Sequence, residues 1–412
     1  MKNTMTLPRI VSADDHVVEP PTLWTERLPA RYADVAPRVE RGQIAPTHAD
    51  SMGRPMTVSP VKYDPRPVDI WCYEDLRMPL WRTMASVGYE RDEVTITPMT
   101  YDEMRPGCWQ QTARLADMDV NGVDASVCYP NAFVRFCGQT FAEARDKQLA
   151  LLCVRAYNDW IVEEWAGGSG GRLIPLCIVP LWDQMLAVAE VERLAARGVR
   201  ALCFSENPAH LGLPSLHSGQ WNDFIAACNG HNMVLNMHFG SSSKLATTSD
   251  DAPAGVPNTL TFVNPAMALT DWLMSGLLEQ FPELKIVFGE CNIGWVPYVL
   301  ERADIVWREN RGWNEVFEKL PNPPTDYFRR QVFMTFFQDD HGVRSIHDIG
   351  IGNVMFETDY PHSDSTWPKS MSFVERYAER MTPDELVRVV RQNAIDLYGV
   401  EITQPVTAGA HG

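Results

Sequence analysis

Ser12-Ala13-Asp14-Asp15-His16-Val17-Val18-Glu19-Pro20 decides the fold of this chain together with a second segment, Phe356-Glu357-Thr358-Asp359-Tyr360-Pro361-His362. Each segment follows an apolar stretch typical of a buried strand, and each places metal-binding side chains where that strand ends. The two segments lie more than three hundred residues apart. If the first and last strands both end in metal ligands, those ends must meet, which predicts a closed barrel with a metal at one rim.

The bulk composition excludes some classes of protein. Of the 412 residues, 45% are hydrophobic and 22% are charged, which is typical of a soluble globular protein. The length is enough for one barrel domain with insertions or for two smaller domains. A net charge of −17 argues against nucleic-acid binding, which depends on an excess of Lys and Arg. The amino terminus lacks a long apolar segment, and no run of about eighteen apolar residues occurs, so we expect a cytoplasmic protein with no membrane partner.

The nine cysteines are odd in number and scattered along the chain. No pair has the CxxC spacing of a zinc knuckle or a redox pair. Several, such as Cys128, Cys177 and Cys203, lie within apolar runs, and we interpret them as small buried hydrophobic residues.

Short apolar runs rich in β-forming residues alternate with amphipathic stretches along most of the chain. The eight runs are Arg9–Ala13, Val123–Tyr129, Leu173–Val179, Val199–Phe204, Met233–Met237, Leu284–Phe288, Val332–Phe336 and Asn353–Phe356. Nearly continuous apolar strands separated by helices indicate a parallel sheet covered by helices. Eight such units favour a (β/α)8 TIM-type barrel over an open doubly wound sheet.

We expect a single barrel domain over residues 1–400, followed by a flexible tail over 401–412. Residues 31–111 fit no strand-helix unit, which predicts a long insertion after the first strand. In a barrel this insertion leaves the carboxyl rim, so it can act as a lid over the site or as an oligomer contact. Its many Trp and Pro residues favour a homo-oligomer or an assembly with a related chain.

Metal-binding side chains follow four of the expected strands. They are Asp14, His16, Glu19, His238, Glu290 and Asp359. Alternation along the first strand places Asp14 and His16 on the same side, so both can point into the barrel mouth. Clustered carboxylates repel one another, and a divalent cation is the simplest compensation.

At these positions the chain resembles the amidohydrolase-related family, which contains aminocarboxymuconate-semialdehyde and resorcylate decarboxylases. The resemblance covers nearly the whole chain and includes Ile293-Gly294-Trp295-Val296-Pro297-Tyr298 and Glu301-Arg302-Ala303-Asp304. It implies a (β/α)8 barrel with four metal ligands, which are Asp14, His16, His238 and Asp359.

Two departures from that resemblance bear on the metal. The decarboxylases carry a catalytic His after the sixth strand, where this chain has Glu290. Binuclear relatives carry a modified Lys on the fourth strand, which here ends in Cys203-Phe204-Ser205-Glu206. A second metal could instead be held by Glu19 and Glu290, and this set of two His and four carboxylates suits iron or manganese. The alternative is a single zinc or manganese ion, with Glu19 and Glu290 orienting its ligands.

The resemblance extends to a branch with dinuclear non-haem iron oxygenases, so we narrowly favour an Fe/Fe or Fe/Mn monooxygenase. It would hydroxylate a C–H bond of a small organic acid or secondary metabolite, and it would need an external electron donor. The rival hypothesis is a mononuclear zinc or manganese hydrolase or decarboxylase, with Glu290 or Asp359 as acid or base. A third is a non-catalytic partner subunit of a related enzyme.

Three further polar residues lie close to the expected metal ligands in the sequence. His362 and Asp364 follow Asp359 on the same rim loop, and we expect His362 to take part in catalysis or to contact substrate. The alternative is that both residues lie on a surface loop. Asn236 lies within the fifth strand, where it could orient His238 or be a satisfied core amide.

Overall fold

The computed structural model describes residues 7–43, 47–49, 55–57, 66–131, 133–314, 316 and 318–402, with only the backbone of 47–49 and 55–57. Most of the expected tail, 403–412, lies outside these residues.

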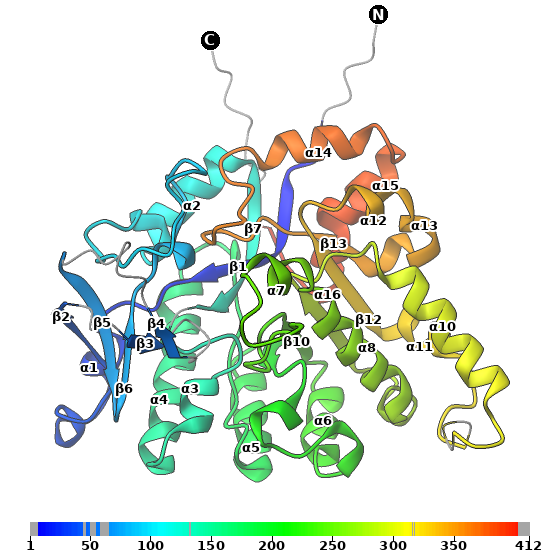
Figure 1. Ribbon diagram of the computed structural model, residues 1–412, viewed down its shortest axis with the longest axis horizontal. Coiled ribbons are helices and arrows are strands. Elements are labelled where there is room, and N and C mark those ends of the chain that lie inside the picture. The colour runs from blue at the N-terminus through cyan, green and yellow to red at the C-terminus, as the bar shows by residue number, and fades with distance from the viewer. Residues whose placement is uncertain are drawn as a thin grey trace, which may run out of the picture.

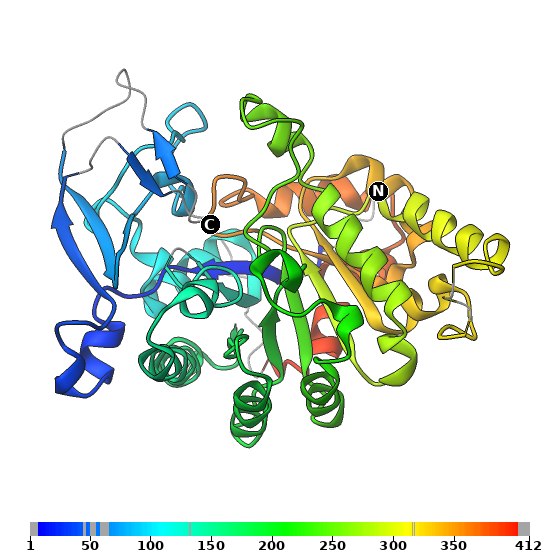
Figure 2. The same cartoon turned by 60° about the horizontal axis from the view of Figure 1, so that its bottom comes forward.

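Eight parallel strands form the centre of the molecule (Figures 1 and 2). They are β1 (Ile10–Val17), β7 (Val123–Pro130), β8 (Leu173–Pro175), β9 (Ala201–Phe204), β10 (Val234–His238), β11 (Lys285–Gly289), β12 (Val332–Phe336) and β13 (Val354–Phe356). β1, β7 and β8 form one sheet, and β9 to β13 pair in chain order to form another. Each of the eight apolar runs identified in the sequence overlaps one of these strands, and β1 continues four residues beyond its run.

Hydrogen bonds at two seams join the sheets into a barrel. Beyond β8, the amide of Cys203 donates to the carbonyl of Cys177 at 2.8 Å. On the opposite side, the amide of Asp359 donates to the carbonyl of Asp14 at 3.0 Å, and the amide of His16 donates to that of Tyr360 at 2.6 Å. The expectation of a TIM-type barrel is therefore confirmed.

Helices cover the outside of the strands, as a parallel barrel requires (Figure 2). Following β7 to β13 along the chain, these include α3 (Gln139–Glu143), α4 (Lys147–Trp160), α5 (Gln184–Ala195), α6 (Asn222–Gly230), α8 (Val263–Ser275), α9 (Leu277–Gln280), α10 (Val296–Glu309), α11 (Pro324–Gln331), α12 (Asp340–Arg344), α13 (Ile346–Ile349), α14 (Ser370–Ala378), α15 (Pro383–Val387) and α16 (Asn393–Tyr398). The short helix α7 (Gly255–Thr259) lies instead at the carboxyl rim of the barrel. Side-chain hydrogen bonds cap the N-termini of several of these helices. The carboxylate of Asp146 accepts the amides of Gln148 and Leu149, and Thr382 and Glu385 form a capping box.

The segment between β1 and β7 has its own architecture. α1 (Leu23–Arg27) comes first, and α2 (Gln111–Asn121) leads into β7. Between them β2 (Arg38–Gly42), β5 (Val68–Tyr73) and β6 (Leu76–Pro79) form an antiparallel sheet, and β3 (Thr47–Ala49) pairs with β4 (Pro55–Thr57). This sheet lies to one side of the barrel, at the left of Figure 1 in blue.

The same segment also reaches the carboxyl rim of the barrel. The amide of Ser86 donates to the carbonyl of Pro361 at 2.7 Å, and the amide of Ser363 donates to that of Thr83 at 3.1 Å. These bonds fix the loop after β13 against the insertion. The insertion therefore forms a wall at the rim, although whether it also contacts another chain stays a prediction.

All nine cysteines are buried and free, as expected of small apolar side chains. None of the helices in the described part of the chain combines the length and apolar character needed to cross a bilayer.

Candidate metal centre

Four of the side chains expected to bind metal converge at the carboxyl rim of the barrel. Asp14 and His16 come from β1, His238 ends β10, and Asp359 follows β13; all four are fully buried. His16 Nε2 lies 3.3 Å from Asp14 Oδ1 and 3.4 Å from Asp359 Oδ1. His238 Nε2 lies 3.6 Å from Asp14 Oδ2. A bulge in β1 between Ser12 and Asp15 accompanies this placement.

These four residues fit a bound cation. Neither oxygen of Asp14 or Asp359, nor Nε2 of His16 or His238, has a hydrogen-bond partner within the described residues. Buried polar atoms normally have partners, so six such atoms converging on one space indicate a ligand between them. Ligand atoms at about 2.1 Å from one ion lie about 3.0–3.5 Å apart, which is close to the observed spacing.

The ring orientation of both histidines leaves Nε2 available for a metal. His16 Nδ1 lies 3.3 Å from the carbonyl oxygen of Pro130, and His238 Nδ1 lies 2.5 Å from that of Phe239. A carbonyl only accepts, so Nδ1 carries the proton in both rings and Nε2 has a free lone pair. The Phe136 ring stacks on His238 with centroids 4.0 Å apart.

Glu290 and His362 extend the cluster toward solvent. Glu290 Oε2 lies 3.2 Å from His238 Nε2, and its side chain is 18% exposed. His362 Nδ1 lies 3.0 Å from Asp359 Oδ1, and its ring stacks on His16 at 3.8 Å. The candidate ligands thus form two groups that share one histidine. One is Asp14, His16 and His238, and the other is His16, Glu290, Asp359 and His362.

The buried carboxyl groups have opposite tendencies to ionise. Burial raises the pKa of Asp14 well above its usual value, and the nearby Asp359 and Glu290 add to this effect although His238 opposes it. Burial also favours the neutral form of Asp359, but His362 and His16 outweigh it and lower the pKa of that carboxyl. A cation among these groups would replace the protons that Asp14 otherwise retains.

Glu19 does not join this cluster, contrary to its prediction as a metal ligand. Its carboxylate accepts three backbone amides, from Asn131 at 3.1 Å and from Phe133 and Val134 at 3.2 Å each. Because these three bonds hold the carboxylate against the loop after β7, it does not point toward the metal cluster. β1 ends at Val17, so strand alternation does not direct the side chain of Glu19 toward the mouth.

Glu357 is a carboxyl group of the site to which the sequence reasoning assigned no role. It is fully buried, bonds to Thr335 through Oε2, and accepts the amide of Glu290 at 3.2 Å. Burial, with Asp14 and other acids nearby, raises its pKa well above the usual value. Glu357 shares strand parity with Asp359, and this signal could have revealed it.

Asn236 is a satisfied core amide, and its hydrogen bonds go to residues other than His238. Its Oδ1 accepts the hydroxyl of Tyr398 at 2.5 Å, and its Nδ2 donates to the carbonyls of Val234 at 3.0 Å and Leu202 at 3.3 Å. Asp364, by contrast, lies largely exposed beside Arg91 on the rim, 3.8 Å from its guanidinium.

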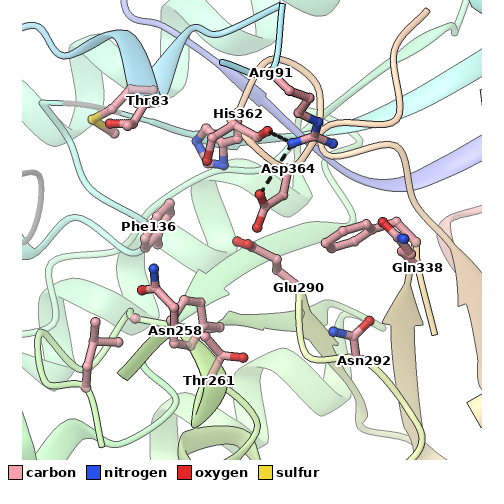
Figure 3. Close-up of a pocket in the computed structure, with 16 residues that line it drawn as sticks. Thr83, Arg91, Phe136, Asn258, Thr261, Glu290, Asn292, Gln338, His362 and Asp364 are labelled. Atoms are coloured by element: carbon pink, nitrogen blue, oxygen red, sulfur yellow. Dashed lines mark hydrogen bonds and ion pairs between the residues drawn. The ribbon is translucent and has the colours of Figure 1, made fainter. Parts of the chain in front are cut away.

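A cavity of about 700 Å³ opens above the cluster (Figure 3). Its walls come from the insertion and from the loops after β7, β10, β11, β12 and β13. The lining includes Thr83, Met84, Arg91, Phe136, Phe239, Gly240, Leu245, Asn258, Thr261, Glu290, Asn292, Phe337, Gln338, His362, Ser363 and Asp364. Its volume suits a small organic ligand. Glu290 and His362 belong to both the cavity and the ligand cluster, so a molecule in the cavity would touch the metal side chains.

The family follows from a comparison with known proteins. The family model described as Amidohydrolase matches residues 61–400, and the chain belongs to this family. The match begins after β1, so Asp14 and His16 lie outside it. The gamma-resorcylate decarboxylase of Polaromonas sp. is 23% identical over 262 residues, which are 61% of this chain and 77% of that protein.

Solved structures support the same fold. An amidohydrolase from Mycobacterium avium subsp. paratuberculosis aligns with a TM-score of 0.68 at 19% identity, covering 95% of this chain and 99% of that one. The 5-carboxyvanillate decarboxylase from Sphingomonas paucimobilis has a TM-score of 0.58 at 22% identity, covering 71% and 84%. A dihydroxybenzoic acid decarboxylase from Polaromonas sp., with bound manganese and the inhibitor 2-nitroresorcinol, has a TM-score of 0.58 at 21% identity, covering 77% and 93%.

The family model confirms the family, and the structural likenesses confirm the barrel. Of the four relatives named here, three are decarboxylases and none is described as an oxygenase. The comparisons therefore fit the decarboxylase alternative better than the oxygenase that the sequence narrowly favoured.

Proposed function

We propose that this protein is a metal-dependent decarboxylase that releases CO2 from a small organic acid, with an aromatic acid as the favoured substrate. The position of Glu290 carries the proposal. It lies at the boundary between the buried ligand cluster and the cavity, 3.2 Å from His238 and partly open to solvent. A proton donor for the carbon that loses its carboxylate has to occupy such a place. The decarboxylases among the relatives add support.

The cluster would hold a divalent metal through Asp14, His16, His238 and Asp359. When bound, the metal supplies positive charge that holds a substrate oxygen and stabilises negative charge as it develops. Manganese is the first candidate because a relative of the same fold binds it. The carboxylates and imidazoles present here suit that metal as well as iron or zinc.

The residues of the cavity would orient the acid and move one proton. The aromatic side chains of Phe136, Phe239 and Phe337 line the walls, where a planar ring can pack. The bond between the ring carbon and the carboxylate carbon breaks, and its electron pair stays on the ring carbon. The carboxylate leaves as CO2, and the carboxyl group of Glu290 donates a proton to that carbon. Its exposed edge lets it recover a proton from water.

A dinuclear oxygenase is the second candidate because the candidate ligands form two groups. His16 has one free ring nitrogen, so it could bind the metal of only one group. The two functions differ in what they require. Decarboxylation consumes no O2 and needs no electron donor, whereas hydroxylation needs both.

The test is turnover of a panel of hydroxylated benzoic acids by manganese-loaded protein under nitrogen and under air. We expect equal CO2 release in both atmospheres. Turnover that stops under nitrogen and needs a reductant would favour the oxygenase.

Glu290→Gln tests the proton donor. We expect kcat to fall by about a hundredfold or more while manganese is retained, because an amide cannot donate the proton. Glu309→Gln is the control, since Glu309 is exposed at the end of α10. Full activity in Glu290→Gln would contradict the assignment.

A further inference from the structure

Two buried carboxylates outside the ligand cluster each bind the backbone of a rim loop. Glu19 follows β1 and Glu206 follows β9, and their exposed fractions are 0% and 2%. Buried carboxylates are costly unless their oxygens are well satisfied. The groups that satisfy these two therefore show what each carboxylate holds in place.

Glu206 holds the turn that directly follows His238. Its Oε1 accepts the amides of Gly240 at 3.0 Å and Ser242 at 3.4 Å, together with the hydroxyl of Ser242 at 2.7 Å. It also accepts Nδ2 of Asn264 at 3.1 Å. All four bonds end on Oε1, and Oε2 has no hydrogen-bond partner within the described residues. The bonds from Gly240 and Ser242 fix the chain two to four residues after His238.

Glu19 holds the loop after β7 in a similar way, through the amides of Asn131, Phe133 and Val134. Convergent backbone amides form a concave site that suits an anion. Charge-assisted bonds of this type are stronger than bonds between neutral groups.

The loop held by Glu19 contacts two histidines of the cluster, His238 and His362. Its Phe136 ring stacks on His238 with an interplanar angle of 23°. The side-chain oxygen of Asn131 lies 3.3 Å from His362 Nε2, while its side-chain nitrogen Nδ2 donates to the carbonyl of Met84 at 3.0 Å. His238 is thus held from one side by the Glu19 loop and from the other by the turn bound to Glu206.

We propose that Glu19 and Glu206 are positioning residues. Each carboxylate accepts hydrogen bonds from one rim loop and so fixes that loop. Together the two loops hold His238 and His362 in place for metal and substrate. The inference rests on the proposed metal centre and not on the proposed reaction. Groups that orient metal ligands from outside typically change metal affinity by tenfold to a hundredfold when they are removed.

Glu206 is tested by comparing two substitutions. Glu206→Ala removes every bond of the anchor, and we expect the affinity for Mn²⁺ to weaken tenfold or more at unchanged stoichiometry. Glu206→Gln keeps a carbonyl oxygen at the position that accepts all four bonds, so its affinity should stay within about threefold of the wild type. Unchanged affinity in Glu206→Ala, or an equal loss in Glu206→Gln, would overturn the role of Glu206.

Ser242→Ala extends the test with a milder change in case Glu206→Ala does not fold. It removes one donor to Glu206 without emptying the anchor, and the expected loss of Mn²⁺ affinity is twofold to fivefold. An unchanged affinity in a folded Ser242→Ala protein counts against the proposal.

Glu19 is tested with Glu19→Gln, in which an amide nitrogen replaces one of the accepting oxygens. We expect Mn²⁺ affinity to weaken threefold to tenfold with the same number of ions bound at saturation. The loss of one bound ion per chain would instead make Glu19 a ligand and overturn its positioning role.

Glu190→Gln is the matched control. Glu190 is equally buried, but it pairs with Arg193 and Asn158 on the outer helices, remote from the cluster. Isothermal titration of each metal-free variant with MnCl2 measures affinity and stoichiometry without substrate, and near-ultraviolet circular dichroism verifies folding. Because no turnover is measured, a wild type that decarboxylates nothing would refute the proposed function and leave this test intact. A loss in Glu190→Gln as large as in Glu206→Ala would show a general stability effect and contradict the proposal.

Discussion

Gly289, the last residue of β11, shows how one missing side chain shapes the metal centre. A Cβ atom at this position would lie 2.2 Å from Asp14 Oδ2 and 2.9 Å from the hydroxyl of Tyr129. Real Cβ atoms do not approach so closely, so any larger residue must displace Asp14 or its own strand. The glycine is therefore needed for space, because its neighbours crowd the position.

We expect Gly289→Ala to abolish or strongly weaken manganese binding and to lower the free energy of unfolding by about 1–3 kcal/mol through overpacking. Gly255→Ala is the control, since no atom lies within 4 Å of a Cβ built at Gly255. Metal content after dialysis and urea unfolding measure the two effects. Normal metal content in Gly289→Ala would show that Asp14 can move without cost to the site.

The sequence could predict the residues whose direction is set by strand geometry. Asp14, His16 and His238 lie within strands, and Asp359 follows one closely, so strand ends alone brought them together. Glu19 could not be placed in this way because it lies beyond the end of β1, where the loop after β7 attracts its carboxylate. The direction of the Glu19 side chain therefore depends on a contact between segments more than a hundred residues apart.

Asp15 of β1 links its own strand to β7 and to the segment after β13 at the barrel seam. Its carboxylate bonds to Ser126 on β7, and it accepts the hydroxyl of Thr358 at 2.6 Å and the amide of Tyr360 at 3.0 Å. These partners place β1 between β7 and the segment after β13, where the barrel closes. Asp15 was not singled out from the sequence, since its neighbours Asp14 and His16 explained the motif.

We expect Asp15→Ala to lower the free energy of unfolding by about 3 kcal/mol or more, because it leaves several buried donors without an acceptor. Asp348→Ala changes an exposed carboxylate on α13 and should stay within about 0.5 kcal/mol. Denaturant unfolding of the metal-free proteins separates this effect from metal binding. Equal stability of the two variants would contradict the role of Asp15 at the seam.

The elements of the barrel could be predicted because their strands are buried on both faces. β7, β9 and β10 are buried along their whole length, which gives a continuous apolar run in the sequence. The antiparallel sheet of the insertion was missed because β2 is half exposed and alternates charged residues with few apolar ones. A run such as Arg38–Gly42 carries no signal that distinguishes a strand from a polar loop.

At the scale of the whole molecule, the barrel closes around a mouth that concentrates acidic groups. Four carboxyl groups, those of Asp14, Glu290, Glu357 and Asp359, come from three parts of the chain that meet only when the barrel is complete. The folded protein therefore bears an electrostatic cost there that a cation relieves. Metal binding and stability should consequently depend on each other.

We expect a chelator to lower Tm, and to lower it more at pH 8 than at pH 6. Burial raises the pKa of Asp14 and Glu357 above the values of the unfolded chain, so the metal-free folded state keeps protons that the unfolded state releases. The stability of the metal-free protein then falls as pH rises above about 4, while the metal displaces these protons. Differential scanning calorimetry with and without chelator measures the difference. A loss of Tm that is larger at pH 6 would contradict this linkage.

The most direct test of the metal centre is anomalous X-ray diffraction from crystals of the protein grown with manganese. We expect an anomalous peak in contact with Nε2 of His16 and of His238 and with the carboxylates of Asp14 and Asp359. A second peak beside Glu290 and His362 would favour a dinuclear site. Crystals that contain manganese elsewhere, with no peak among the four expected ligands, would contradict the proposed metal centre.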